Sequence, residues 1–157
     1  MEALFQRLFK ELRQGTRSSE LSCRQLADRL SQEGTRICSE SKRIQDSGDV
    51  ESWAASLGKH RLTQCLKYYK LGSQRGRVDL HSTLSAIVYR YITPPQVQAS
   101  YQARLNLIED FLQGFYVESL NAFRRENQLS ETYQPRTLLE LAEYMAFTER
   151  YAKRRIP

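Results

Sequence analysis

The sequence predicts an all-α protein, a single compact domain of about six helices around a long central helix at residues 95–126. Three observations predict this fold class. Apolar residues recur at spacings of three and four along most of the chain, only 7 Gly and 4 Pro interrupt its 157 residues, and no convincing segment alternates polar and apolar residues as a strand does. A chain of this length suits one domain with one core, so we expect residues 1–157 to form a single helical domain.

Start and stop signals place the individual helices. Ser22 opens the second helix, and Asp79 opens the fourth after a Gly- and Arg-rich loop at residues 72–77. Thr137 and Glu140 have the spacing of a capping box and open the sixth. The expected helices cover residues 2–14, 22–46, 50–71, 79–92, 95–126 and 137–153.

The helix at residues 95–126 is the longest of the six, with Pro95 in its first turn. Within it, the stretch FLQGFYVESLNAF at residues 111–123 is apolar on nearly all sides of a helical wheel. A helix of this kind packs against neighbours on several sides. We therefore expect it to form the centre of the fold.

The positive charge of the chain is concentrated between Lys59 and Tyr91. This stretch holds seven basic side chains and one carboxylate, Asp79, so its surplus equals the formal net charge of +6 of the whole chain. Four tyrosines are interleaved with these cations. A charge surplus confined to one stretch indicates a surface for a polyanionic partner, and aromatic residues among the cations are typical of elements that face phosphates.

The arrangement of these cations on helical wheels gives a candidate DNA interface. Three lysines of the third helix lie away from its apolar stripe, and two arginines extend the same surface through the loop. The fourth helix turns small polar side chains outward, which suits entry into a groove of double-stranded DNA such as a promoter. The candidate DNA-binding residues are Lys59, Lys67, Lys70, Arg75, Arg77, Ser82, Ser85 and Tyr89. Arg61 lies toward the apolar stripe instead, where it either extends its head group to solvent or pairs with a carboxylate.

Two alternatives to this interpretation remain open. The segment RQLADRLSQEGTRI, residues 24–37, resembles a helix-turn-helix with Gly34 at the break, although a glycine within a helix costs only about 1 kcal/mol and need not mark a turn. The second alternative is a helical protein–protein interaction domain whose basic patch meets an acidic protein surface and which forms a homo-oligomer or binds another regulator.

Several other functional classes find no support in the sequence. His60 and His81 lack helical metal-ligand spacing, and no Walker-type phosphate loop or nucleophile elbow is present, so we expect no enzyme, no metal and no cofactor. The N-terminus is amphipathic and contains acids, unlike a signal peptide, and no apolar run is long enough to span a membrane. Three cysteines without a CxxC pair indicate reduced thiols in a cytoplasmic protein.

Three long strings carry a resemblance to a known family. They are ICSESKRIQDSGDVESWAASLGKHRLTQCLKYYKLGSQRGRVDLHSTLSAIVYRYI, FYVESLNAFRRENQL and TLLELAEYMAFTERYAKRRIP. Together with the residues between them, they make the chain resemble the HetZ-like regulators of heterocyst differentiation in cyanobacteria from about residue 20 onward. The resemblance implies a DNA-binding transcription regulator that acts early in heterocyst development and works with the regulator HetR. Members of this family are longer, so we expect this chain to be the N-terminal part of a longer protein.

Overall fold

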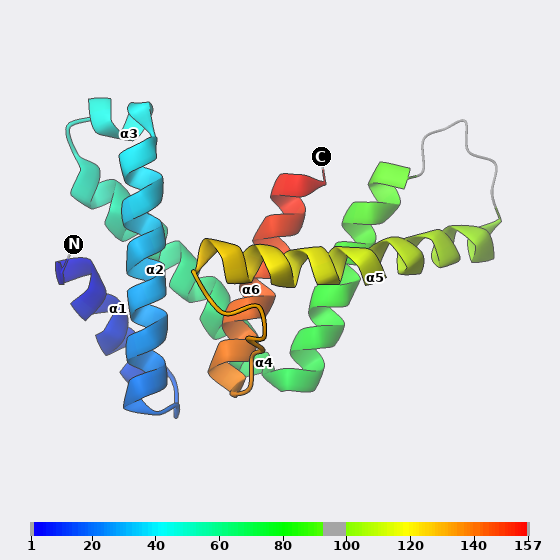
Figure 1. The fold of residues 1–157 in the computed structure, drawn as a ribbon, viewed down its shortest axis with the longest axis horizontal. Helices are drawn as coiled ribbons and strands as arrows, with labels where there is room; N and C mark the ends of the chain where they lie inside the picture. The colour runs from blue at the N-terminus through cyan, green and yellow to red at the C-terminus, as the bar shows by residue number, and fades with distance from the viewer. Residues whose placement is uncertain (1, 93–99, 157) are drawn as a thin grey trace.

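The computed structural model describes residues 2–92 and 100–156 and contains six helices and no strand within those ranges (Figure 1). The predicted all-α class and the predicted number of helices are therefore confirmed. The helices are α1 (Glu2–Gly15), α2 (Glu20–Glu40), α3 (Lys42–Asp46), α4 (Val50–Ile92), α5 (Tyr101–Glu126) and α6 (Leu138–Arg155).

Serine and threonine side chains fix where several helices begin. The N-cap of α2 is Ser19, whose side chain accepts from the backbone N–H of Ser22, so the helix starts before the predicted cap at Ser22. Ser41 ends α2 and caps α3, which divides the single helix predicted at 22–46. The predicted capping box of α6 is confirmed, because the Thr137 side chain accepts from the Glu140 N–H while the Glu140 carboxylate accepts from the Thr137 N–H.

Helix α4 bends sharply at one residue, Gly72. Its φ of 85° and ψ of 174° lie in a region that is essentially reserved for glycine, and the helix resumes directly afterwards. The predicted loop at 72–77 is therefore wrong, and Asp79 lies within a helical turn rather than at a cap. One turn beyond the bend, a Cβ on Gly76 would lie 2.8 Å from Cε of Met145, which shows how closely α4 approaches α6.

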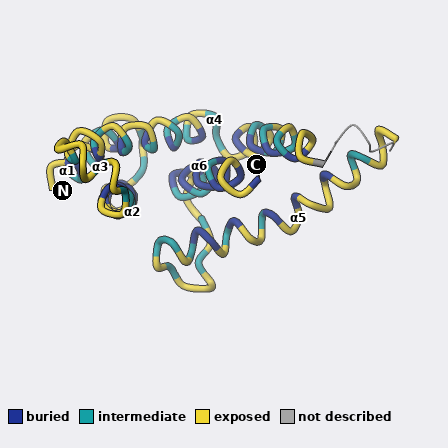
Figure 2. The backbone as a smooth tube through the Cα atoms, turned by 90° about the horizontal axis from the view of Figure 1, so that it is seen from above, coloured by how far each residue is buried: buried dark blue, intermediate teal, exposed yellow. Residues whose placement is uncertain are grey.

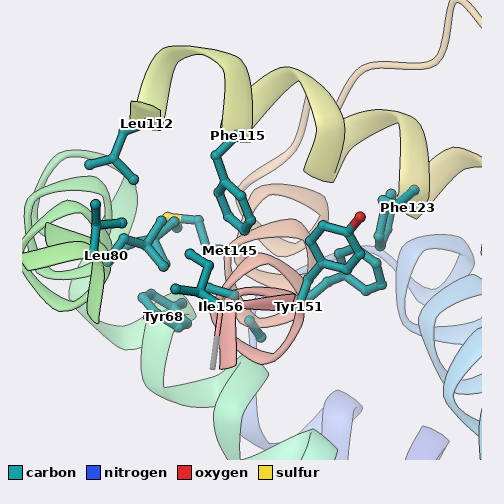
Figure 3. Packing of buried hydrophobic residues seen from close by; sticks show 14 of the residues in the cluster. Tyr68, Leu80, Leu112, Phe115, Phe123, Met145, Tyr151 and Ile156 are labelled. Atoms are coloured by element: carbon teal, nitrogen blue, oxygen red, sulfur yellow. The ribbon is translucent and has the colours of Figure 1, made fainter. Parts of the chain in front are cut away.

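The apolar side chains gather in two clusters, and the second of them contains residues from both sides of this bend. The N-terminal cluster joins α1, α2 and the first half of α4, and it includes Leu8, Leu12 and Leu26. The second cluster joins α4, α5 and α6 (Figure 3). Its labelled members are Tyr68, Leu80, Leu112, Phe115, Phe123, Met145, Tyr151 and Ile156.

All three cysteines are buried and free. Cys23 and Cys38 belong to the N-terminal cluster, and Cys65 belongs to the second cluster. Burial is the main reason why the pKa of the Cys65 thiol is raised to about 12. The thiols are therefore part of the core packing.

The centre of the fold is α4 together with α6, and not the helix predicted at 95–126. Ten of the 18 residues of α6 are buried, whereas α5 buries a single stripe along its 26 residues. Phe111 and Val117 of α5, which were expected in the core, are exposed, and Val117 keeps 62% of its surface. Figure 2 shows that buried and exposed segments alternate along α5. The predicted start of that helix at Pro95 lies outside the described residues. Among the described helices, none is long and apolar enough to cross a membrane.

Candidate nucleic-acid interface

The second half of α4, residues 73–92, carries an exposed ridge, which we call the α4 face. It consists of Arg75, Val78, Ser82, Ser85 and Tyr89, spaced three or four residues apart on one side of the helix. Four of these residues are exposed and Ser85 is half-buried. The opposite side of the same turns packs Leu80, Leu84 and Val88 into the second cluster. The outward direction expected for Ser82, Ser85 and Tyr89 is therefore observed.

Four of the candidate cations lie on the surface of α4, two on each side of the bend. Lys59 and Lys70 are exposed on the first half of α4, and Arg75 and Arg77 are exposed just after the bend. Within residues 2–92 and 100–156, no carboxylate lies within ion-pair distance of any of the four. Their charge is not neutralised by the fold itself.

Lys67 differs from the other candidate cations. Its Nζ lies 3.2 Å from Oδ2 of Asp79 and 3.6 Å from Oε1 of Glu149, and it sits 4.8 Å from the centre of the Tyr68 ring. These contacts connect the first half of α4, its second half and α6 across the bend. Lys67 thus has partners within the fold, which the sequence pattern on α4 alone did not reveal.

Tyr89, the largest side chain of the α4 face, is in contact with α5. The Arg104 guanidinium lies 5.8 Å from the centre of its ring, at cation–π distance. Tyr89 remains 44% exposed. A partner can therefore reach Tyr89 while Arg104 restricts the orientation of its ring.

An apolar groove of about 730 Å³, which the sequence did not indicate, runs beside the α4 face. Val78 and Leu80 of α4, Tyr116 of α5 and Leu141 and Met145 of α6 are among its lining residues. At its edge, His81 Nδ1 lies 3.0 Å from the Tyr116 hydroxyl, and His81 Nε2 lies 2.9 Å from Oε1 of Glu109. Burial, followed by Tyr144 and Glu109, raises the pKa of Tyr116 to about 12, so its hydroxyl stays protonated. The residues that line the groove are spread between positions 77 and 145 of the sequence, which is why no short motif indicated it.

Other arginines are engaged in ion pairs between helices, and we call this set the inner ion-pair network. Arg29 donates from Nε and Nη2 to both oxygens of Glu143 at 2.8 and 2.7 Å, and Arg61 Nε donates to Oε1 of Glu33 at 2.7 Å. Arg150 Nη2 lies 3.7 Å from Oε2 of the same Glu33. For Arg61, the pairing alternative is therefore the one observed. Burial alone would lower the pKa of Arg29, but its bond to Glu143 and the charge of that carboxylate raise it.

The structure does not support the alternative in which residues 24–37 form a DNA-binding helix-turn-helix. Helix α2 runs without interruption from Glu20 to Glu40, and Gly34 is buried, with Leu4 Cδ2 3.6 Å from where its Cβ would lie. The helix-turn-helix interpretation of this segment is therefore wrong, because Gly34 lies within a continuous helix and forms no turn.

The described residues contain no group of three or more His, Cys, Asp or Glu side chains placed to hold a metal ion. What the arrangement offers is a helical ridge with small polar side chains, one aromatic ring and unneutralised cations beside it. Such a surface can bind a polyanion through charge and can present hydrogen-bonding groups to base edges.

Comparison with known proteins gives one match. The family model described as "Heterocyst differentiation protein HetZ-like" matches residues 4–157. No curated protein and no solved structure gives a significant match to the chain.

Proposed function

The chain belongs to the HetZ-like family of heterocyst differentiation proteins, and from this premise we propose that it regulates transcription by binding double-stranded promoter DNA. The family implies a role in heterocyst differentiation and favours a regulator over an enzyme. The proposal adds the molecular activity and the surface that performs it.

The observation that carries the proposal is the charge state of the α4 face and its surroundings. Arg75, Arg77, Lys59 and Lys70 are exposed and lack carboxylate partners among the described residues. Cations of this kind release condensed counterions from DNA when they approach phosphates, and this release supplies most of non-specific DNA affinity. Lys67 is held by Asp79 and Glu149, so we expect it to support the bend more than to contact phosphates.

The shape of the α4 face also suits a groove. From Arg75 to Tyr89, a helix rises about 21 Å, a length that lies readily along one segment of the major groove. Ser82 and Ser85 are short enough for the backbone to approach the bases, and their hydroxyl groups can donate or accept. We propose that Arg75 and Arg77 set the position on the DNA, whereas Ser82, Ser85 and Tyr89 read sequence.

A salt titration of DNA affinity tests this proposal. Fluorescence anisotropy would compare a candidate promoter duplex with a scrambled duplex for the wild type and for Arg75→Ala/Arg77→Ala. Loss of two phosphate contacts should weaken binding to both duplexes and flatten the slope of log affinity against log salt by about 1.8. The matched control is Lys42→Ala/Arg125→Ala, which removes two exposed cations outside the α4 face.

Equal affinity and slope in the wild type and in a folded Arg75→Ala/Arg77→Ala variant would remove this surface from the DNA interface. Substitution Tyr89→Ala addresses sequence reading separately. It should change the ratio of promoter to scrambled affinity by about 1–3 kcal/mol. The salt slope should stay close to that of the wild type, because Tyr89 carries no charge.

The second candidate function is recognition of another protein, such as HetR or a second copy of this chain. The observation in its favour is the apolar groove next to Arg77 and the exposed Val78, because burial of apolar surface drives protein association. Competition separates the two candidates. Random-sequence DNA in excess should displace a DNA ligand from the α4 face and should leave a protein bound in the groove in place.

A further inference from the structure

A second recess lies on another part of the molecule, between α2, the first half of α4, α6 and the end of α5. This cleft has a volume of about 740 Å³. Phe147 and Tyr151 form part of its wall, and both are buried in the second cluster. A volume of this size accommodates a small molecule and is typical of ligand sites in proteins.

The lining of the cleft is predominantly basic. Glu33, Glu40 and Glu126 are its carboxylates. They are outnumbered by basic side chains that reach the cleft from α2, α4 and α6, namely Arg36, His60, Arg61, Arg150, Lys153 and Arg154. The surplus of basic side chains makes the cleft a concave surface of net positive charge, and such a surface concentrates anions.

The deepest pair of arginines shares one carboxylate. Glu33 accepts a bond of 2.7 Å from Arg61, whereas Arg150 lies 3.7 Å from its other oxygen and donates to the amide oxygen of Gln64 at 3.3 Å. Burial lowers the pKa of the Arg150 guanidinium, and the charge of Arg61 lowers it further against the favourable effect of Glu33. An additional anion at this point would therefore be stabilised by Arg150.

Two further groups at the cleft have no carboxylate within ion-pair distance among the described residues. Arg36 donates from Nη1 to the backbone oxygen of Glu126 at 3.3 Å, and His60 is exposed. By contrast, Arg154 pairs with Glu126 at 3.0 Å and Lys153 pairs with Glu149 at 3.0 Å. Arg36 and His60 are thus the basic groups of the cleft without a carboxylate partner, whereas Arg150 shares Glu33 with Arg61.

We propose that this cleft binds a small phosphorylated ligand with at least two negative charges. Guanidinium groups match the geometry of phosphate oxygens, and the partly compensated pair of Arg61 and Arg150 provides a fixed positive charge for them. None of the residues that line the cleft belongs to the α4 face. The ligand site is therefore separate from the proposed DNA interface and does not depend on it.

Calorimetric titration of the whole chain with inorganic pyrophosphate and with Mg²⁺-free ATP tests the proposal. Adenosine is the uncharged control, and sodium chloride at matched ionic strength controls for screening. The rim variant Arg36→Gln/His60→Gln should bind both anions at least about tenfold more weakly than the wild type, because it removes two donors to a charged ligand. Lys10→Gln, an exposed cation on α1 outside the cleft, should bind them as the wild type does.

Each outcome decides for or against the site. Saturable binding of pyrophosphate or ATP that the rim variant loses and Lys10→Gln retains supports it. No binding at millimolar concentration, or equal loss in the rim and control variants, overturns it. Displacement of bound ATP by an acidic or phosphorylated peptide at lower concentration would instead assign the cleft to a protein partner and would also overturn the small-molecule proposal.

Since Arg36 and His60 lie outside the α4 face, the rim variant should bind DNA as the wild type does. Failure of the cleft proposal therefore leaves the DNA proposal intact. Conversely, loss of DNA binding in Arg75→Ala/Arg77→Ala leaves anion binding in the cleft unchanged, so the two failures are distinguishable.

Discussion

The inner ion-pair network and the α4 face use the same residue types in opposite ways. Arg29 reaches both oxygens of Glu143, and its side chain is only 16% exposed. Arg75 and Arg77 are exposed and have no carboxylate partner among the described residues. The first arrangement joins α2 to α6 and its charge is neutralised within the fold, whereas the charge of the second remains available to a partner.

The difference shows that the role of an arginine depends on carboxylates supplied by distant segments. Glu143 lies 114 residues from Arg29 in sequence, and Glu33 lies 28 residues from Arg61. Removal of a buried partner leaves an uncompensated charge in a poorly solvated place, but removal of an exposed cation leaves only solvent. Four substitutions test this difference, and we describe them from the largest expected effect on stability to the smallest.

Substitution Glu143→Ala should destabilise the protein most, by about 3 kcal/mol, because it leaves the Arg29 guanidinium without its carboxylate. Urea denaturation followed by circular dichroism measures this change. The double variant Arg29→Met/Glu143→Leu should be more stable than Glu143→Ala, since apolar side chains of similar size can replace a buried ion pair. If Glu143→Ala unfolds at the same urea concentration as the wild type, the network contributes nothing to stability and the comparison fails.

The bend that separates the two halves of α4 provides the second test. Gly72→Ala should cost about 2 kcal/mol, because its φ of 85° and ψ of 174° are strained for any residue with a Cβ. Gly114→Ala in α5 is the matched control, since Gly114 is helical and has no atom within 4 Å of the added Cβ. There we expect a gain of about 0.5–1 kcal/mol in the same denaturation experiment. A gain at Gly72 as well would show that the bend is not fixed by this backbone conformation.

Glu149 of α6, which accepts hydrogen bonds from Tyr68 and Lys153, makes stability depend on pH. Burial alone would raise its pKa, but the hydrogen bond from Tyr68, the bond from Lys153 and the charge of Lys67 together lower it. A carboxylate with a lowered pKa stabilises the fold above its unfolded pKa, near 4.3, and this contribution is lost as the pH falls through the folded value. The wild type should therefore lose stability between about pH 5 and pH 3.

In Glu149→Gln this loss should be smaller, and the variant should be less stable than the wild type at pH 7 by about 1.5 kcal/mol, as expected for hydrogen bonds to a charged group. Glu131→Gln, at an exposed carboxylate, should reproduce the pH profile of the wild type. A profile of Glu149→Gln that coincides with the wild type would exclude Glu149 as the source of the acid sensitivity.

The smallest effect on stability is expected on the α4 face itself. Arg75→Ala should change the free energy of unfolding by less than about 0.5 kcal/mol, because an exposed cation without a partner contributes little to the fold. The same variant should flatten the salt dependence of DNA affinity by about 0.9. A large loss of stability without a change in the salt dependence would reverse the assignment and make Arg75 a structural residue.

Local signals in the sequence predicted most of the helical architecture. The capping box at Thr137 and Glu140 depends on residues near one another, and the outward direction of Ser82 and Tyr89 depends on helical periodicity. These features are confirmed because local hydrogen bonds and helix geometry determine them.

The predictions that proved wrong concern features that depend on contacts between distant segments. The segment GSQRGR at residues 72–77 predicts a loop, but Gly72 forms a bend of one residue and the helical turns after it pack closely against α6. Because apolar residues lie on nearly all sides of residues 111–123, the sequence predicts that this helix is central. The most extensive packing lies instead between α4 and α6, and Phe111 and Val117 are exposed. The partners of Lys67 and the groove beside the α4 face likewise require three helices to be placed in space.

The buried thiols make it possible to measure local opening of each apolar cluster separately. Cys23 and Cys38 lie in the N-terminal cluster and Cys65 lies in the second, so a thiol reagent modifies each only after the cluster around it opens. When closing is faster than modification, the labelling rate measures the free energy of that opening event. In variants that keep a single cysteine, the labelling rate would thus give the free energy of opening of one cluster. A ligand in the cleft or DNA on the α4 face should slow the labelling of the cluster that it stabilises.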